Sequence, residues 1–321
     1  TNYLKPYHDN LEIYQSYLSE IDFIYSKSKY AKEINAVRPL IVKEKKLVIK
    51  NAFHPLLYSS NKKQKIKTFP QSIKIDEQNR IIVISGPNAG GKSITLKTIG
   101  LLQLMVQSGI LVSVDANSEF CVFNTIISDI GDNQSIENQL STYSYRLNNM
   151  NDFLQKCDNK TMFLIDEFGT GSDPELGGAL AEVFLEVFYN RKSFGVITTH
   201  YSNLKLLADE LPFMSNANME FDDKTLKPTF NLVVGDAGSS FTFEVAQNNG
   251  IPLDLIKKAK KKINSGKIRF DESISKLQKQ RYKLDSTTKS LLEEEEKFKK
   301  ENEKLNILSL IHISEPTRPI D

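Results

Sequence analysis

Three runs of apolar residues, each ending in polar residues, predict three strands of a buried sheet. They cover Arg80–Ser85, Met162–Glu167 and Gly195–His200. Consecutive apolar positions are typical of parallel strands that are covered on both faces. Because ligands of such sheets bind beyond the carboxyl ends of the strands, the polar residues that close each run are candidate binding residues.

A period of three to four residues predicts helices beside these strands. Residues 94–105 form an apolar helix directly after the first strand, and residues 1–33 repeat apolar side chains at helical spacing. We interpret residues 1–33 as the end of a longer helical arm, with a self-contained helical hairpin as the alternative. Polar residues interrupt the stretch from Ile99 to Val114, which therefore predicts a buried helix running into a strand.

The C-terminal region carries an apolar residue at every seventh position. These residues are Phe270, Leu277, Leu284, Leu291, Phe298 and Leu305. The alternate seam positions are mostly polar, namely Ile274, Arg281, Thr288, Glu295 and Asn302. This pattern predicts a narrow coiled coil, with a lone solvated helix as the alternative. Residues 308–321 break the pattern and resemble a translated sequencing adapter, so they carry no functional argument.

The segment Gly86–Ser93 matches the phosphate-binding P-loop pattern, and it lies between a predicted strand and a predicted helix. Its glycines allow a tight turn whose N–H groups point at phosphate oxygens, and the helix dipole adds to the attraction. Lys92 is expected to contact the β- and γ-phosphates, and Ser93 to bind Mg²⁺. The predicted nucleotide ligands are Gly86, Pro87, Asn88, Ala89, Gly90, Gly91, Lys92 and Ser93.

Polar residues at the ends of the other two strands extend this site. Asp166 is the expected metal partner, as at other P-loop sites, and Glu167 is the candidate base for the attacking water. The alternative is a solvated pair of acids. His200 is expected to contact the γ-phosphate or the water, with a structural histidine as the alternative. In Gly169–Glu175, Ser172 or Asp173 predicts a helix cap.

Together these segments resemble the MutS family of ABC-type ATPases, and more narrowly its second bacterial branch, linked to recombination suppression and ribosome rescue. The resemblance covers roughly residues 30–265. The segments that carry it are residues 86–102, 128–144, 164–182, 196–205 and 234–252. It implies an α/β P-loop fold of the ABC type, with a mixed, largely parallel central sheet flanked by helices, a helical arm and a C-terminal coiled coil.

The resemblance also implies roles for single residues, with ATP and Mg²⁺ as cofactors. Glu167, Lys92 and His200 are the implied catalytic residues, and Ser93 and Asp166 the metal ligands. Ser141 and Thr142 match the signature segment that reaches the γ-phosphate of the opposing subunit.

Two further positions compare less completely with the family. Phe69 lies where the family contacts adenine. Residues 51–57 resemble an Ala-Arg-His-Pro-Leu-Leu motif, but Phe53 replaces its arginine, so no role passes to that position.

The implied domain organisation has four parts. Residues 1–50 form the end of a helical lever, residues 51–262 the ATPase domain, residues 263–307 a basic coiled-coil helix and residues 308–321 the adapter-like tail. Because the signature acts on the opposing subunit, the active unit is expected to be a homodimer with two-fold symmetry.

The expected function is a nucleic-acid-remodelling ATPase that closes on ATP and opens on hydrolysis. Its expected substrate is branched or recombining DNA, or a stalled ribosome and its rRNA. A mismatch-repair MutS is one alternative. An SMC- or Rad50-like chromosome ATPase is another, although Gln139–Tyr143 differs from the Leu-Ser-Gly-Gly-Gln signature of those proteins. A metabolic kinase would leave Ser141 and Thr142 unexplained. Endonuclease activity is expected only of a longer protein that includes the Smr nuclease domain.

Composition adds bounds on partners and location. The 321 residues carry a net charge of +2, and the basic excess lies between residues 253 and 306. Lysine clusters there suit phosphate backbones, with a solvated helix face as the equal alternative. Cys121 and Cys157 show no metal-like spacing and fit a reducing cytosol. With no signal peptide or membrane span visible, we expect a cytoplasmic, nucleoid- or ribosome-associated protein without membrane contact.

Overall fold

A computed structural model divides the chain into two compact units, Thr1–Lys267 and Ile268–Asp321. The structure describes residue 3 and residues 7–87, 90–131, 142–171, 173–222, 227–238, 243, 246–247 and 249–262, together with scattered positions between 276 and 302. The predicted nucleotide-binding segments all belong to the first unit.

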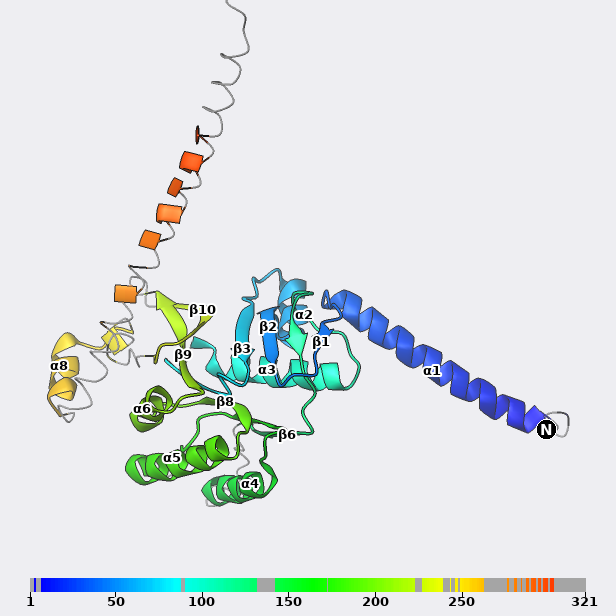
Figure 1. The fold of residues 1–321 in the computed structure, drawn as a ribbon, viewed down its shortest axis with the longest axis horizontal. Helices are drawn as coiled ribbons and strands as arrows, with labels where there is room; N and C mark the ends of the chain where they lie inside the picture. Colours follow the sequence, from blue (N-terminus) through cyan, green and yellow to red (C-terminus); the bar gives the residue numbers. More distant parts are fainter. Residues whose placement is uncertain are drawn as a thin grey trace, which may run out of the picture. The chain divides into compact units, whose positions relative to one another are not determined.

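A six-stranded sheet forms the centre of the first unit (Figure 1). Its strands are β4 (Ile81–Ser85), β6 (Thr125–Asp129), β7 (Thr161–Ile165), β8 (Phe194–Thr198), β9 (Met214–Asp222) and β10 (Lys227–Val234). They lie in the order β10-β9-β4-β8-β7-β6. All neighbours are parallel except the antiparallel pair of β9 and β10. The prediction of a mixed, largely parallel sheet is confirmed, and β4, β7 and β8 are the three predicted strands.

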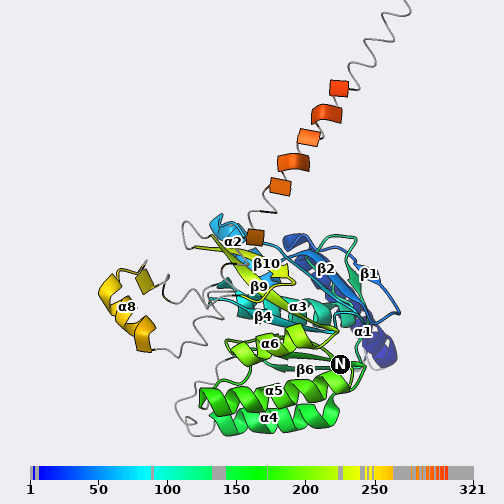
Figure 2. The ribbon, with the colours of Figure 1, turned by 60° about the vertical axis from the view of Figure 1, so that its left-hand side comes forward.

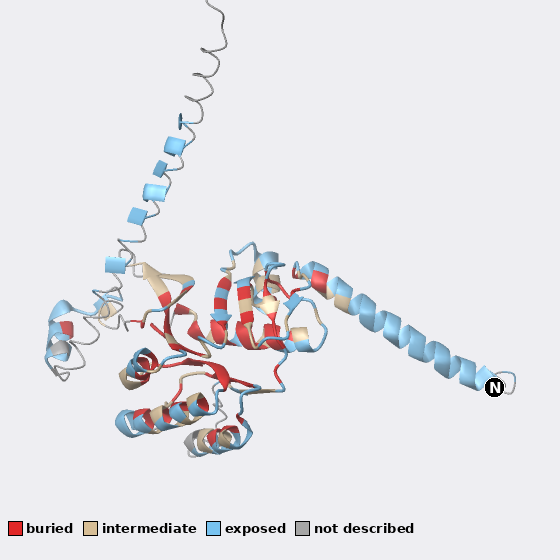
Figure 3. Ribbon diagram, in the orientation of Figure 1, coloured by how far each residue is buried: buried red, intermediate tan, exposed pale blue. Residues whose placement is uncertain are grey.

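Alternating residues of β4 supply both faces of the sheet with apolar side chains. Ile82 and Ile84 join the core that contains Leu96 of helix α3 (Lys92–Gln107), while Ile81 and Val83 join a second core with Leu185 of helix α5 (Pro174–Asn190). Helices therefore cover both faces, which is why this strand is apolar throughout. Figure 3 shows the central strands as buried.

Helices α4 (Thr142–Lys156) and α5 pack against each other on the second face, as Figure 2 shows. Helix α6 (Ser202–Glu210) contacts α5, β9 and β4 on the same face. Asp173 caps α5 by accepting from the backbone N–H groups of Glu175 and Leu176, and Pro174 occupies the first turn. The cap predicted at Ser172 or Asp173 is thus formed by Asp173; Ser172 lies outside the described residues.

A second, four-stranded sheet lies against the α3 side of the core and was not predicted. Its strands are β1 (Leu40–Ile41), β2 (Leu47–Ala52), β3 (Gln71–Ile75) and β5 (Glu119–Phe120), in the order β1-β5-β2-β3. Helix α2 (Pro55–Gln64) connects β2 to β3. The domain boundary expected at residue 50 falls within β2. The strand expected after α3 was wrong, because Val112 forms only an isolated bridge with Val37.

Helix α1 (His8–Glu33) confirms the helical periodicity at the N-terminal end of the chain. Its apolar side chains, including Leu11, Tyr14 and Leu18, are exposed, and Ala31 near its C-terminal end is buried. The function of this helix as part of a longer lever stays a prediction. Among the described residues, no helix combines the length and apolar character that a membrane span requires.

The C-terminal part of the chain is described only in part. Helix α8 (Leu253–Lys262) ends the described portion of the first unit. In the second unit, Leu284, Leu291 and Phe298 occupy helical positions and are exposed. Phe270, Leu277 and Leu305 lie outside the described residues, so the coiled coil stays a prediction.

Candidate nucleotide-binding site

The P-loop connects the end of β4 to the start of α3, as its pattern predicts. Gly86 and Gly91 adopt positive φ angles of 122° and 94°, which side chains with a Cβ rarely tolerate. A Cβ atom built on Gly90 would lie 3.0 Å from the Cβ of Met219 in β9. The glycines therefore allow both the turn and its close contact with β9. Asn88 and Ala89 lie outside the described residues.

Lys92 is buried at the first position of α3. Its Nζ donates to the carbonyl oxygens of Gly86 and Pro87 at 2.6 and 3.0 Å. Burial lowers the pKa of Lys92 to about 8, although the charges of Glu167 and Asp166 act in the opposite direction. The lysine thus lies close enough to both predicted acids for their charges to interact.

Thr198 at the end of β8 connects the two acidic residues. Its hydroxyl donates to Asp166 Oδ1 at 2.6 Å and accepts from the backbone N–H of Glu167 at 2.7 Å. Glu167 has a φ of 50°, in the left-handed region that non-glycine residues seldom adopt. Such backbone strain is concentrated at functional sites, where surrounding contacts maintain it.

A polar cavity of about 120 Å³ lies beside these acids. Its lining residues are Ser93, Lys97, Gly131, Arg146, Asp166 and Glu167. Hydroxyl and carboxylate oxygens are ligands that Mg²⁺ prefers, and the ion usually keeps waters and substrate phosphates as its other ligands. Within the described part of the chain, no cluster of three or more His, Cys, Asp or Glu residues forms a metal cage. The donor set therefore fits Mg²⁺ bound together with phosphate.

His200 lies two residues beyond β8, and its surroundings suit a phosphate. Burial, together with the positive charges of Lys92 and Lys205, lowers the pKa of His200 to about 4. Its Nε2 atom is buried and has no hydrogen-bond partner among the described residues. A buried polar atom without a partner is costly, so a bound anion or water at this position would satisfy it.

Lys205 was not singled out from the sequence, yet it lies close to this cluster. It is buried in α6 and donates to the carbonyl of Gly238 at 2.8 Å. The N–H of Gly238 in turn donates to Ser85 Oγ at 2.6 Å. These bonds attach the segment after β10 to the strand that leads into the P-loop.

Phe69, the predicted adenine contact, packs on a second aromatic ring. Its ring centroid lies 5.3 Å from that of Phe230 in β10, and the Lys67 ammonium lies 4.9 Å from the Phe69 centroid. A Cβ built on Gly91 would lie 3.3 Å from the Phe230 ring. The two rings thus extend from the P-loop to a partly exposed face. Phe230 also has a positive φ of 59°.

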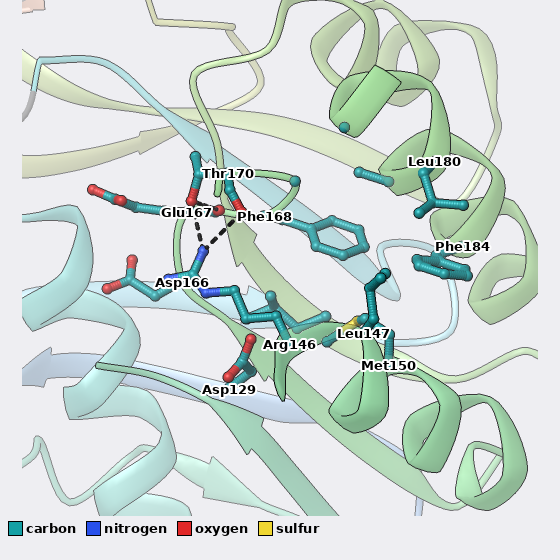
Figure 4. Close-up of a pocket in the computed structure, with 14 residues that line it drawn as sticks. Asp129, Arg146, Leu147, Met150, Asp166, Glu167, Phe168, Thr170, Leu180 and Phe184 are labelled. Carbon is teal, nitrogen blue, oxygen red and sulfur yellow. Dashed lines mark hydrogen bonds between the residues drawn. The ribbon is translucent and has the colours of Figure 1, made fainter. Parts of the chain in front are cut away.

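Arg146 and Asp129 are further residues that sequence reasoning missed. Both line a second cavity of about 30 Å³ between α4, α5 and the end of β7, shown in Figure 4. Burial raises the pKa of Asp129, while the nearby Arg146 charge acts to lower it. The position of Arg146, one helical turn after the signature segment, is the signal that could have identified it.

The predicted signature residues are only partly described. Ser141 lies outside the described residues, and Thr142 is the first residue of α4. The structure brings the other predicted site residues to one end of the sheet, namely Lys92, Ser93, Asp166, Glu167 and His200. The roles of all these residues stay predictions.

A glycine-rich loop between β4 and α3, with two acids beyond β7 of the same parallel sheet, defines the P-loop class of α/β proteins. The family model for MutS domain V matches residues 82–266. The chain therefore belongs to the MutS family, within the branch whose members are named MutS2.

Curated relatives support this assignment over most of the chain. The protein named Endonuclease MutS2 from Finegoldia magna is 39% identical over 306 residues, which cover 93% of this chain and 38% of that protein. The proteins of the same name from Caldicellulosiruptor saccharolyticus and Lactiplantibacillus plantarum are 38% and 40% identical. Their matches cover 87% and 81% of this chain. The chain spans about a third of the length of these relatives, 35% and 32% for the latter two.

Proposed function

We propose that this chain is the ATP-hydrolysing part of a nucleic-acid-remodelling protein. The observation that carries the proposal is the single polar cavity that Ser93, Asp166 and Glu167 line together, with Lys92 close to both acids. Phosphate binding, metal binding and activation of water require these groups at one place. Their arrangement supports hydrolysis of a nucleoside triphosphate over simple binding.

In the proposed reaction, the backbone N–H groups of the P-loop and the Lys92 ammonium bind the phosphates. Ser93 and Asp166 would hold Mg²⁺, which neutralises charge on the phosphate oxygens when bound. Glu167 orients the attacking water and accepts its proton. His200 Nε2 is buried without a partner among the described residues, and it binds the γ-phosphate or the water.

We further propose that two copies form the active unit. The support is the family resemblance of Ser141 and Thr142, which would complete the site of the opposing subunit. ATP then favours the closed dimer, and hydrolysis opens it. An isolated protomer would have an incomplete site, so ATP turnover should depend on protein concentration.

Nucleic acid is the proposed substrate. The protein is proposed to act in the cytoplasm, at the nucleoid or on ribosomes. The relatives bear the name Endonuclease MutS2, and an endonuclease acts on nucleic acid. Branched or recombining DNA is the first candidate, through the resemblance to this branch. A stalled ribosome and its rRNA remain the second candidate, on the basis of the branch resemblance alone. Endonuclease activity is proposed only for a longer protein.

The test compares ATP turnover and Mg-ATP affinity of the wild-type chain and Glu167→Gln. The variant should keep its affinity and lose turnover, because the amide cannot accept the proton. Wild-type turnover in Glu167→Gln would overturn the assignment of the base.

The longer gene product is then assayed with branched DNA and with 70S ribosomes separately. Stimulation by DNA alone supports the DNA role, and stimulation by ribosomes alone supports the ribosome role.

A further inference from the structure

The backbone of Glu167 is held from both sides in its strained conformation. On one side, its N–H donates to Thr198 Oγ1 at 2.7 Å. On the other side, its carbonyl accepts from the Thr170 N–H at 3.1 Å and from the Thr170 hydroxyl at 2.9 Å. The φ of 50° persists because these bonds compensate for its cost.

Arg146 of α4 contacts the same threonine. One guanidinium nitrogen, Nη1, donates to Thr170 Oγ1 at 2.6 Å and to the Thr170 carbonyl at 3.3 Å, as Figure 4 shows. The Thr170 hydroxyl therefore accepts from Arg146 while it donates to Glu167. Hydrogen bonds from a charged donor are shorter and stronger than neutral ones. A continuous chain of hydrogen bonds thus runs from α4 to the backbone of the candidate base.

The helix that carries Arg146 starts at the predicted signature segment. Thr142 is the first residue of α4, and Arg146 follows it by four residues. Residues four apart lie on the same face of a helix, one turn from each other. A shift of the start of α4 would consequently be transmitted to Arg146 as a rigid displacement.

We propose that Arg146 is a positioning residue, which fixes Glu167 through Thr170 and thereby links the signature end of α4 to the hydrolysis site. This inference rests on the proposed function, in which Glu167 is the base. Arg146 itself takes no part in proton transfer. Its contribution is to keep the Glu167 carboxylate at the position that the attacking water requires.

A purely structural role for Arg146 predicts a different result from a positioning role. If Arg146 only attached α4 to the loop, its loss would lower the melting temperature and leave kcat per folded molecule unchanged. A displaced base instead lowers kcat while nucleotide affinity stays the same, because a misplacement of about 1 Å costs up to about a hundredfold in rate. Separate measurement of kcat and of the Kd for Mg-ATP distinguishes these outcomes.

The experiment uses two matched pairs of variants in the wild-type chain. Thr170→Val removes the hydroxyl at constant shape, whereas Thr170→Ser retains it. Arg146→Met removes the charged donor at similar length, whereas Arg146→Lys retains one. Thr170→Val and Arg146→Met should each lower kcat by about tenfold to a hundredfold at an unchanged Kd for Mg-ATP. Thr170→Ser should recover most of kcat, and Arg146→Lys a part of it.

The double variant tests whether the two residues act as one unit. Residues that share a single interaction show strongly non-additive effects, so Arg146→Met with Thr170→Val should be no slower than the slower single variant. Multiplication of the two effects would overturn the proposed chain of contacts. Asp152→Asn, which removes an exposed pair with Lys156 on the same helix, is the control for general disturbance of α4.

Glu167→Gln, measured in parallel, separates this inference from the function on which it rests. If Glu167→Gln retains turnover, the proposed function and this inference are both overturned. If Glu167→Gln is inactive while Thr170→Val and Arg146→Met keep wild-type kcat, only the inference is overturned. A rise in the Kd of Arg146→Met at unchanged kcat would make Arg146 a nucleotide ligand and would also overturn it.

Discussion

The Lys92 ammonium donates a hydrogen bond to the carbonyl oxygen of Gly86, at the opposite end of the P-loop, with an N–O distance of 2.6 Å. This contact gives the buried lysine a partner within its own loop. A phosphate that enters the loop would compete with the carbonyl for the same donor. The P-loop thus holds the Lys92 ammonium inside the turn where the phosphates are proposed to bind.

The pH dependence of nucleotide binding should report the protonation of Lys92. Burial lowers its pKa to about 8, so the free protein loses this charge as the pH rises through 8. A bound triphosphate favours the charged form and raises the pKa, so binding should take up a proton above pH 8. We expect affinity to fall by up to about tenfold for each pH unit there.

Calorimetry in buffers of different ionisation enthalpy measures this proton uptake directly. Lys92→Arg is the control, because arginine does not titrate in this range. Nucleotide binding to this variant should take up no proton, so its binding heat should be the same in every buffer. Equal heats in all buffers for the wild-type chain at pH 9 would contradict the prediction.

His200 should make the fold less stable in acid. Its pKa in the folded chain is about 4, compared with a usual value of 6.5, because burial and two lysine charges oppose protonation. Between these values the unfolded chain binds the proton more readily than the folded chain. The contribution of neutral His200 to the free energy of unfolding is therefore complete above pH 6.5. It is lost as the pH falls toward 4, an effect on the order of 2 kcal/mol.

Urea unfolding at pH 7.5, 6.0 and 5.0 checks this effect. The difference between wild type and His200→Asn isolates the histidine from other titrating groups. His200→Asn should lose less stability than the wild type between pH 7.5 and 5.0. Parallel pH profiles for the two proteins would show that His200 is not held in its neutral form.

The aromatic pair Phe69 and Phe230 should contribute affinity only for the base of the nucleotide. Stacking of a base on an aromatic side chain is worth about 1–3 kcal/mol, so Phe69→Ala should weaken ATP binding by about tenfold or more. Its affinity for inorganic triphosphate, which has no base, should not change. Competition binding with ATP and with triphosphate distinguishes the two, and an equal loss for both ligands would reject the assignment.

Gly195 should be sensitive to the smallest substitution because of its contact with Phe163. A Cβ built on Gly195 would lie 2.4 Å from the Phe163 ring, which is fully buried and packs against Phe188 of α5. We expect Gly195→Ala to destabilise the fold by about 1–3 kcal/mol, as overpacking of a dense core does. Urea unfolding measures the loss. Phe163→Leu, which frees space at the ring, should reduce the cost of Gly195→Ala in the double variant.

The strands that carry the site were predictable because their signals are local. Each strand is a short apolar run, followed directly by polar residues of the site. The run is apolar throughout because helices pack on both faces of the sheet. The P-loop was predictable for the same reason, because its glycines, lysine and serine occur at fixed spacing. Asp166, Glu167 and His200 needed only the rule that parallel strands end at one edge.

The rest of the site depends on contacts between distant segments. Phe230 lies in β10 where the register with β9 shifts, between Pro228 and Leu232, and neither the pairing nor the register has a local signal. Arg146 and Thr170 are 24 residues apart and meet only because α4 packs against α5 and β6. In the small sheet, β1 and β5 have two residues each, too few to show alternation. The alternation of buried and exposed residues in β3 was a local signal that the sequence analysis did not use.

The interleaving of the two sheets has a consequence for any attempt to isolate the nucleotide-binding core. β5 follows α3 in sequence, yet it pairs with β1 and β2, which precede the P-loop. A chain trimmed to the family-matched residues 82–266 would keep Phe120 and lose the strands that cover it. The nucleotide-binding core is therefore not an independently folding fragment. The trimmed chain should expose apolar surface and aggregate.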